Sequence, residues 1–553
     1  MEVETQRTVE RTSWKELALV VVLALAAQAR MLGNELVYDD RVLVENPALR
    51  APWSFPGTWG ETWWGVAKPG TGLYRPLASW TLSVQGWMNE RLGFAFESVG
   101  AFHAANALVH AAASALVLLY LRALGLGRGA AVIAASLFAV LALHVEALAP
   151  VTGRSETLAL GFGLAFALLH TRRSSPWAAA ACFLAALACK ESAAGFLVLA
   201  GLHDVVVRRE RPAWGRLALA GGALVAYLGA RAWVLRGEHG AVFFVDNPLV
   251  AASAWERVLT ACVVQLDYLR LACVPIGFRS DASHAELELA RGLGDGRVLL
   301  FLGVLGGLVA WAVRAWPRQR AVALSLVGYA VLFAPASNVL FVIGTPRAER
   351  LAYAPSLFVC ALFGVSIAAL GAQGARLLAR SGSAADARGP ERRARGIASV
   401  AAGLLVVWNL AASWQRSAVW RDPATFFRAQ VAEAPRSAKA RFNLGAQLAA
   451  EGDDPSAERE YGEALRLWPD HHEALYNLGN LLRRRKEPER ALELYRRALE
   501  LQPQFLPPAF GIVGALHELG RDDEARAMLA QVERRAPSHP WLPAHRKLLE
   551  RGR

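Results

Sequence analysis

The sequence has few charged residues and few cysteines. Asp, Glu, Lys and Arg make up only 19% of its 553 residues, whereas hydrophobic residues make up 54%. Ordinary soluble domains carry about 25% charged residues. The five cysteines do not form a disulfide framework. Cys182, Cys189 and Cys360 fall inside apolar segments, and Cys262 and Cys273 would lie roughly 16 Å apart along a helix, too far to bridge. This composition argues against a single soluble core and against a disulfide-stabilised secreted domain.

Several common binding motifs are also missing. The sequence contains no P-loop, no dinucleotide-binding glycine fingerprint and no Cys/His spacing typical of zinc sites. Its Gly-x-Gly occurrences lie inside apolar segments, where close helix packing explains them. The net charge of +13 does not indicate a nucleic-acid partner, because many of the arginines cluster between hydrophobic segments.

Apolar segments dominate the chain up to about residue 413. Eleven of them are present, at 17–33, 102–122, 129–143, 156–170, 177–189, 192–207, 214–235, 297–314, 320–338, 351–371 and 397–413. Several are shorter than 18 residues, so we expect their ends to extend into the loops. The sequence therefore predicts an all-α, polytopic membrane domain of about eleven transmembrane helices over residues 1–413.

Arginine clusters set the expected orientation of these helices. Five clusters alternate with the apolar segments: Arg122 and Arg128; Arg172 and Arg173; Arg208, Arg209, Arg211 and Arg216; Arg314, Arg318 and Arg320; and Arg376, Arg380, Arg388, Arg392, Arg393 and Arg395. Placing all five in the cytoplasm satisfies the positive-inside rule and puts the C-terminus outside. The external segments are then 34–101, 144–155, 190–191, 236–296 and 339–350. The charged apolar stretch 256–275 is better suited to an interfacial helix than to a span.

The first apolar segment has a second interpretation. Ala27-Gln28-Ala29 follows a short apolar run and resembles a signal-peptidase site. Cleavage there would leave the topology after residue 34 unchanged.

The remainder of the chain repeats with a period of 34 residues. Asn443-Leu444-Gly445 recurs as Asn477-Leu478-Gly479, and Pro435, Pro469, Pro503 and Pro537 share the same spacing. This is the tetratricopeptide period. It predicts a linker and partial repeat at 414–437, three repeats at 438–539 forming a solenoid, and a C-terminal cap at 540–553. Such arrays bind peptides or helices, although an inert stalk is the alternative.

Polar residues gather in the predicted external segments and at the helix ends beside them. The first external loop carries Asp39 and Asp40, and adjacent carboxylates at a bilayer surface are costly unless they serve acid/base or metal chemistry. Further candidates follow along the chain: His103, Asn106, His144, Glu146, Arg154, Glu156, Lys190, Glu191, Arg347, Arg350 and Tyr353.

These candidates have simpler interpretations too. His103, Asn106 and His110 share one helical face, which suits packing of polar helix ends more often than a metal. Lys190 and Glu191 form an adjacent pair that could neutralise itself. Arg347 and Arg350 open an apolar segment from the outside, against the usual charge bias. Arginine matches phosphate bidentately, so a phosphate ligand is the favoured interpretation there.

Together these motifs resemble the transmembrane and tetratricopeptide-repeat-containing O-mannosyltransferases, within the GT-C glycosyltransferases. The resemblance is carried in order by these motifs: Tyr38-Asp39-Asp40 with Asn46-Pro47, Tyr74-Arg75-Pro76-Leu77, Phe102-His103-Ala104-Ala105-Asn106, His144-Val145-Glu146-Ala147, Gly153-Arg154-Ser155-Glu156, Cys189-Lys190-Glu191, Asp246-Asn247-Pro248, Phe278-Arg279-Ser280-Asp281 and Glu349-Arg350-Leu351-Ala352-Tyr353-Ala354-Pro355-Ser356. One departure is that Leu141 and Ala142 stand where the family usually has His-Pro, which weakens the assignment of the sugar.

The resemblance implies an inverting transfer of a sugar, with mannose favoured, from a polyprenyl-phosphate carrier to Ser or Thr hydroxyls of proteins outside the membrane. Asp39 or Asp40 would be the base and Arg350 the phosphate ligand, assisted by Arg75, Arg154 or Lys190. It also implies a bacterial inner-membrane location, with the repeats on the periplasmic side recruiting a protein or peptide acceptor. No cofactor is certain, and the need for a divalent metal is left open. The alternatives are another lipid-linked glycan transfer or a non-catalytic membrane scaffold.

Overall fold

The computed structural model describes residues 12–44, 46–54, 57–64, 72–237, 240, 242–381 and 388–550, without the side chains of 377–381, 388–392 and 395. All the regular secondary structure in these residues is helical, and none of them forms a strand. The side chains of Arg380, Arg388, Arg392 and Arg395 in the fifth arginine cluster lie outside the described part. The chain divides into two compact units. Unit 1 comprises 1–242, 249–280 and 289–423, and unit 2 comprises 243–248, 281–288 and 424–553.

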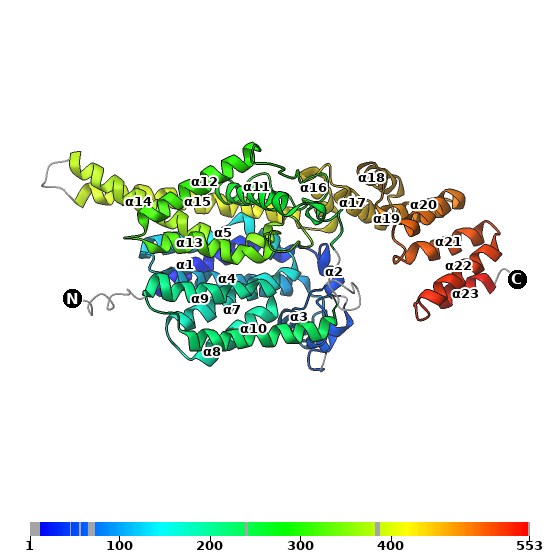
Figure 1. Ribbon diagram of the computed structural model, residues 1–553, viewed down its shortest axis with the longest axis horizontal. Coiled ribbons are helices and arrows are strands. Elements are labelled where there is room, and N and C mark those ends of the chain that lie inside the picture. Colours follow the sequence, from blue (N-terminus) through cyan, green and yellow to red (C-terminus); the bar gives the residue numbers. More distant parts are fainter. Residues whose placement is uncertain are drawn as a thin grey trace. The chain divides into compact units, whose positions relative to one another are not determined.

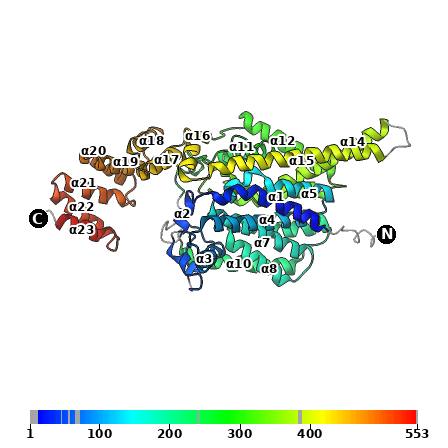
Figure 2. The ribbon, with the colours of Figure 1, turned by 180° about the vertical axis from the view of Figure 1, so that it is seen from behind.

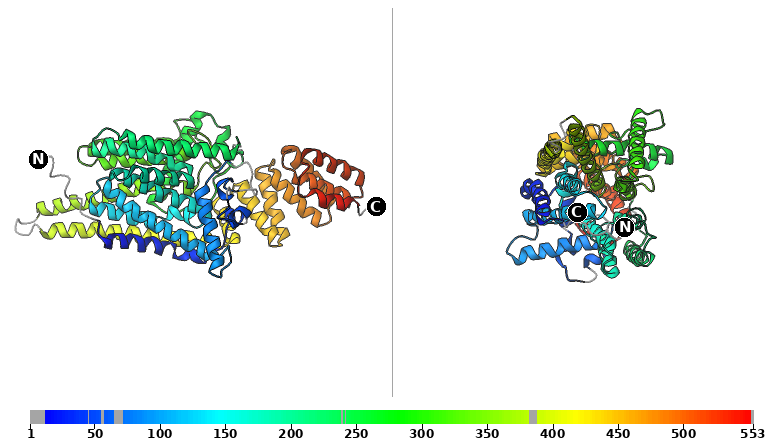
Figure 3. Two further views of the ribbon diagram at one scale, coloured as in Figure 1. Left: turned by 90° about the horizontal axis from the view of Figure 1, so that it is seen from below. Right: turned by 90° about the vertical axis from the view of Figure 1, so that its left-hand side faces the viewer.

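Unit 1 is a bundle of roughly parallel helices (Figures 1 and 2). Its longer helices are α1 (Trp14–Gln28), α4 (Val99–Ala123), α5 (Arg128–Val140), α7 (Arg154–Thr171), α8 (Pro176–Cys189), α9 (Gly195–Leu202), α10 (Trp214–Leu235), α11 (Ala254–Cys273), α12 (Gly296–Ala315), α13 (Arg320–Phe333), α14 (Ser356–Ser381) and α15 (Arg388–Val419). Figure 3 shows the bundle from the side and along its helices.

Six helices in the described residues are long and apolar enough to cross a membrane, and a seventh candidate is the bent pair Arg128–Val140 and Ala142–Leu148. The six are Trp14–Gly33, Val99–Ala123, Trp214–Leu235, Gly296–Ala315, Ser356–Arg376 and Gly396–Val419. Pro176–Cys189 and Arg320–Ala336 are apolar but shorter. The chain is thus a multi-pass membrane protein. The count of eleven spans stays a prediction.

Helix α3 and several short elements gather at one end of the bundle. They are α2 (Asp39–Val44), η3 (Pro47–Arg50), η4 (Gly57–Trp59), α3 (Pro76–Arg91), η6 (Ala142–His144), α6 (Val145–Leu148), η7 (Val151–Gly153), η8 (Glu191–Ala194), η10 (Pro248–Ala251), η11 (Ala334–Ala336) and η12 (Glu349–Ala352). In Figure 1, α2 and α3 lie at this end, and α3 runs across the bundle in Figure 3. The chain extends past α1 as η2 (Ala29–Gly33), and η9 (His203–Arg208) is a π-helical turn that continues α9.

Unit 2 consists of helix pairs. After α16 (Pro423–Glu433) come α17 (Ala438–Ala450) with α18 (Asp454–Leu467), α19 (His472–Arg484) with α20 (Pro488–Leu501), α21 (Pro507–Glu518) with α22 (Asp522–Arg535), and then α23 (Leu542–Glu550). A Cβ on Gly445 would lie 2.8 Å from the Tyr461 ring, and one on Gly479 would lie 2.7 Å from Tyr495. The repeated glycine is therefore needed where the paired helices cross. At the corresponding position of the third pair, Val513 is fully buried.

Two segments from the long connection between α10 and α12 belong to unit 2. Phe244 and His284 pack on Trp468, with ring centroids 5.5 and 4.7 Å away. Lys439 also pairs with Asp246 at 2.5 Å. The repeat unit is thus completed by residues that precede it by more than 150 positions.

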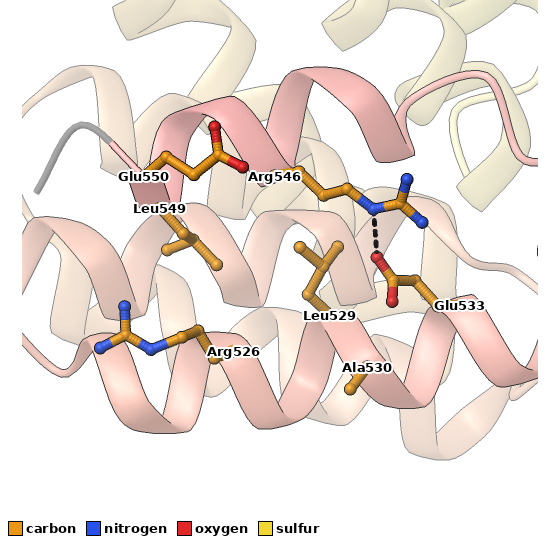
Figure 4. Close-up of a pocket in the computed structure, with 7 residues that line it drawn as sticks. All are labelled: Arg526, Leu529, Ala530, Glu533, Arg546, Leu549 and Glu550. Atoms are coloured by element: carbon orange, nitrogen blue, oxygen red, sulfur yellow. Dashed lines mark hydrogen bonds and ion pairs between the residues drawn. The ribbon is translucent and has the colours of Figure 1, made fainter.

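A groove of unit 2 lies between α22 and α23, with a volume of about 510 Å³ (Figure 4). Leu529 and Leu549 form its apolar floor, and Arg546 bonds Glu533 across it at 2.6 Å. None of the candidate site residues lines it.

Candidate active site

Asp39 and Asp40 open α2, but only Asp40 is buried. The Asp40 carboxylate accepts hydrogen bonds from the backbone N–H of Val151 at 3.0 Å and of Thr152 at 2.9 Å. Burial raises the Asp40 pKa to about 7, although these two N–H groups oppose the shift. Asp40 therefore ties α2 to η7, and the half-exposed Asp39 beside it faces solvent more than Asp40 does.

The residue before this pair has an uncommon backbone conformation. Tyr38 has a φ of 57°, in the left-handed region. A large non-glycine residue takes this conformation only when its surroundings hold it there. The conformation sets the entry of the chain into α2 and so the position of Asp39.

Glu146 organises the second part of the site. Its carboxylate accepts the backbone N–H of Glu349 at 2.5 Å and of Arg350 at 3.3 Å, and it forms an ion pair with the Arg350 guanidinium. Glu146 is buried, whereas the Arg350 side chain is 45% exposed. Desolvation alone would lower the pKa of Arg350, but the charges of Glu146 and Asp39 raise it. Asp39, Glu146 and Arg350 therefore act on one another electrostatically at the same end of the bundle.

A buried ion pair holds η12 in position. Arg416 Nη2 lies 3.2 Å from Glu349 Oε1, and both side chains are almost fully buried. The backbone N–H of Arg279 also donates to Glu349, at 3.0 Å. Arg347 is 96% buried, bonds Asp267 at 2.7 Å and donates to the Arg279 carbonyl at 3.0 Å. Arg347 is thus placed as a support of the loop, while Arg350 is accessible.

The adjacent residues Lys190 and Glu191 do not pair with each other in the structure. Lys190 forms a buried ion pair with Glu156, and Glu191 pairs with Arg75 at 3.4 Å. The Arg75 guanidinium also lies over the Trp63 ring at 5.6 Å. Two cations from separate elements are thereby held beside two carboxylates, and Glu191 keeps 39% of its side chain exposed.

Arg154 and Asn106 form a buried polar joint. Arg154 Nε donates to Asn106 Oδ1 at 2.7 Å, and its Nη2 donates to Gln85 at 2.5 Å and to the Phe102 carbonyl at 3.3 Å. Asn106 Nδ2 in turn lies 3.4 Å from the carbonyls of Pro150 and Val151. Because these groups are used internally, Arg154 is placed to hold η7 and α3 in position.

The histidines are buried behind η12. His110 Nδ1 lies 2.8 Å from the Tyr353 hydroxyl, and His144 Nε2 lies 2.7 Å from Ser356 Oγ. The His144 and Tyr353 rings are 4.7 Å apart. His103 is also buried. Within the described residues, no group of three or more His, Cys, Asp or Glu side chains is arranged to hold a metal ion.

The candidate residues thus fall into two groups that differ in solvent exposure. Asp39, Arg350, Glu191 and part of Arg75 reach the surface, whereas the other candidates are buried and support them. The sequence alone did not indicate Arg416 or Gln85 as members of the network, and it gave Arg279 and Ser356 only as parts of motifs, without a role. One feature of the sequence could have pointed to Arg416, because this residue is a charge just beyond the last apolar segment.

A multi-span helical membrane domain with a charged site at one end, followed by tetratricopeptide-type helix pairs, defines the class of this protein. The tetratricopeptide repeat family model matches residues 472–505. Human "Protein O-mannosyl-transferase TMTC4" is 30% identical over 516 residues, covering 81% of this chain and 66% of that protein. "Protein O-mannosyl-transferase F38B6.6" of Caenorhabditis elegans is 26% identical, covering 83% of this chain and 64% of that protein.

Human "Protein O-mannosyl-transferase TMTC1" is 27% identical over 84% of this chain and 56% of its own length. The chain is a homologue of these transmembrane and tetratricopeptide-repeat-containing proteins. It spans about two thirds or less of the length of the curated relatives it matches.

Proposed function

We propose that this protein transfers a sugar, with mannose favoured, from a polyprenyl-phosphate carrier to Ser or Thr hydroxyls of proteins. The names of its homologues support protein O-mannosylation in general. The single observation that carries the proposed mechanism is the exposed Arg350 guanidinium, which is ion-paired with Glu146 and whose pKa is raised by the charges of Glu146 and Asp39 at the same end of the bundle.

Asp39 is the general base in this proposal. A Ser or Thr hydroxyl is a poor nucleophile at neutral pH, so a placed carboxylate must take its proton as it attacks. Asp39 is half-exposed, whereas Asp40 already accepts two backbone N–H groups. Asp40 then acts as a positioning residue that fixes α2.

Arg350 binds the phosphate of the carrier. The hydroxyl oxygen forms a new bond to the anomeric carbon while the bond from that carbon to the phosphate oxygen breaks, which inverts the configuration. The departing lipid phosphate gains negative charge, and a guanidinium placed beforehand stabilises it. Glu146 sets the position of Arg350, and the apolar helices accommodate the lipid tail, as in GT-C enzymes. Arg75 and Lys190 are the assisting cations.

The repeats recruit the acceptor polypeptide, outside the cytoplasm and on the side of the membrane where Asp39 acts. Tetratricopeptide repeats commonly bind peptides or helices. Two other functions remain as alternatives: another lipid-linked glycan transfer, and a non-catalytic scaffold in which only the repeats act.

The test is a transfer assay with the purified full-length protein. Radiolabelled polyprenyl-phosphate sugars are offered with a panel of protein, peptide and lipid acceptors, with and without a metal chelator. The expected result is transfer of labelled mannose to Ser or Thr, with release of the label from the protein by alkaline β-elimination. Preference for another sugar or a lipid acceptor would favour the first alternative. Acceptor binding without any transfer would favour the scaffold.

A further inference from the structure

We propose a second lipid site, for the headgroup of an anionic glycerophospholipid, at the opposite end of the bundle. It is a groove of about 460 Å³ between the first turns of α8 and α10. Pro176, Trp177, Trp214 and Leu219 give it an apolar lining, and Arg216 adds a cation.

The two tryptophans place the groove at the membrane boundary. Trp177 is 72% and Trp214 is 70% exposed, which is unusual for side chains of this size. Trp214 is the first residue of the candidate span Trp214–Leu235, and Trp177 is the second residue of the apolar helix α8. Tryptophan is enriched where apolar chains meet headgroups. The groove therefore opens at headgroup level, with its apolar lining toward the acyl chains.

The connections beside the groove carry unneutralised positive charge. The local carboxylates are already engaged: Asp204 accepts from His170 at 3.1 Å and Arg173 at 3.2 Å, and Glu210 pairs with Arg208 and Arg173. Arg172, Arg209 and Arg211 are exposed, and no ion pair to them occurs in the described part of the chain. This surplus complements an anionic headgroup and not a zwitterionic one.

Arg216 lines the groove and is the next arginine in the sequence after the exposed ones. Its Nη2 donates to the Leu169 carbonyl at 3.1 Å, which brings the start of α10 against the end of α7. The same helix α7 begins at Arg154, which belongs to the candidate active site. Fifteen residues of helix separate Arg154 from Leu169, or roughly 22 Å. The groove is therefore a different site from the one that holds Arg350.

The experiment measures phospholipid binding by native mass spectrometry of the full-length protein. The probes are phosphatidylglycerol, phosphatidylcholine and a polyprenyl phosphate. Two double variants test the charges and the aromatic walls: Arg172→Gln with Arg211→Gln, and Trp177→Leu with Trp214→Leu. Both change exposed side chains, and thermal unfolding checks the fold. The matched controls are Arg314→Gln with Arg318→Gln, and Trp233→Leu at the far end of α10.

We expect one tightly bound phosphatidylglycerol in the wild type, little phosphatidylcholine, and unchanged binding in the controls. Removing two cations should weaken phosphatidylglycerol binding about 30-fold, and loss of the tryptophans should also weaken it. Equal binding of the two phospholipids, or unaltered phosphatidylglycerol binding in both folded test variants, would overturn the proposal. A preference for polyprenyl phosphate lost in the same variants would also overturn it.

Discussion

Asp39 and Asp40 are neighbours in sequence but meet different surroundings. Both carboxylate oxygens of Asp40 accept hydrogen bonds from backbone N–H groups of η7. Asp39 is partly exposed, and its charge acts on Arg350. The sequence predicted the pair but could not divide the roles, because the partners of Asp40 lie about 110 residues further along the chain.

Asp40 makes stability depend on pH. Burial raises its pKa from the ordinary carboxyl value to about 7, so the folded protein favours the protonated form. This contribution is complete below about pH 4 and is lost as the pH rises through 7. We expect the melting temperature of the wild type to fall between pH 5 and pH 8 more steeply than that of Asp40→Asn, measured in the same detergent. Parallel profiles would show that Asp40 is ionised throughout.

Arg350 should contribute to donor binding through its shape as well as its charge. Arg350→Lys keeps the charge but loses the planar fork. We expect weaker binding of a mannosyl polyprenyl phosphate to Arg350→Lys and a larger loss in Arg350→Ala, both folded. Arg91→Gln, an exposed arginine over Trp87, is the control. Unchanged donor affinity in both Arg350 variants would exclude a role in donor binding and leave Arg350 only as the ion-pair partner of Glu146.

At the scale of elements, the apolar pattern predicted helices well and their connections poorly. The predicted segment 102–122 is α4 at Val99–Ala123, and the charged stretch 256–275 is α11 at Ala254–Cys273. Helix α3 was not predicted inside the loop 34–101, since its tryptophans, serines and glycine form no continuous apolar run. The pairing of Glu349 with Arg416 was also missed, because it joins two elements through tertiary packing alone.

The turn η7 needs glycine at its last residue. A Cβ on Gly153 would lie 2.1 Å from the Ala147 carbonyl oxygen. We expect Gly153→Ala to destabilise the protein by about 1–3 kcal/mol and to lower transfer activity, since Asp40 is held by the same turn. Thermal unfolding and the transfer assay measure both effects.

Gly161→Ala in α7 is the matched control, because a Cβ there meets open space. An alanine in that helix should leave stability equal or raise it slightly. Equal stability of the two alanine variants would mean that η7 can move away from α6 without cost.

At the scale of the whole molecule, we predict that the repeats lie on the outer side of the membrane. Labelling must use an exposed position, and Ser437, at the start of the repeats, is fully buried and caps α17. Asp523 in α22 has a fully exposed side chain. Cys273 is also exposed, so it is first replaced by serine to remove background labelling.

We expect Asp523→Cys in intact cells or spheroplasts to react with a membrane-impermeant maleimide, since eleven predicted spans with five cytoplasmic arginine clusters would put the C-terminus outside. Arg318→Cys, in a predicted cytoplasmic connection, should react only after the membrane is opened. The reverse pattern for the two cysteines would require a different number of spans.

The most direct measurement of the proposed mechanism compares Asp39→Asn with the wild type in mannose transfer from polyprenyl phosphate to a protein acceptor. Donor binding and melting temperature are recorded for both. If Asp39 is the base, turnover should fall by roughly 10²–10⁴ while donor affinity and folding are kept. Full turnover by Asp39→Asn would contradict the account and place the base elsewhere in the chain.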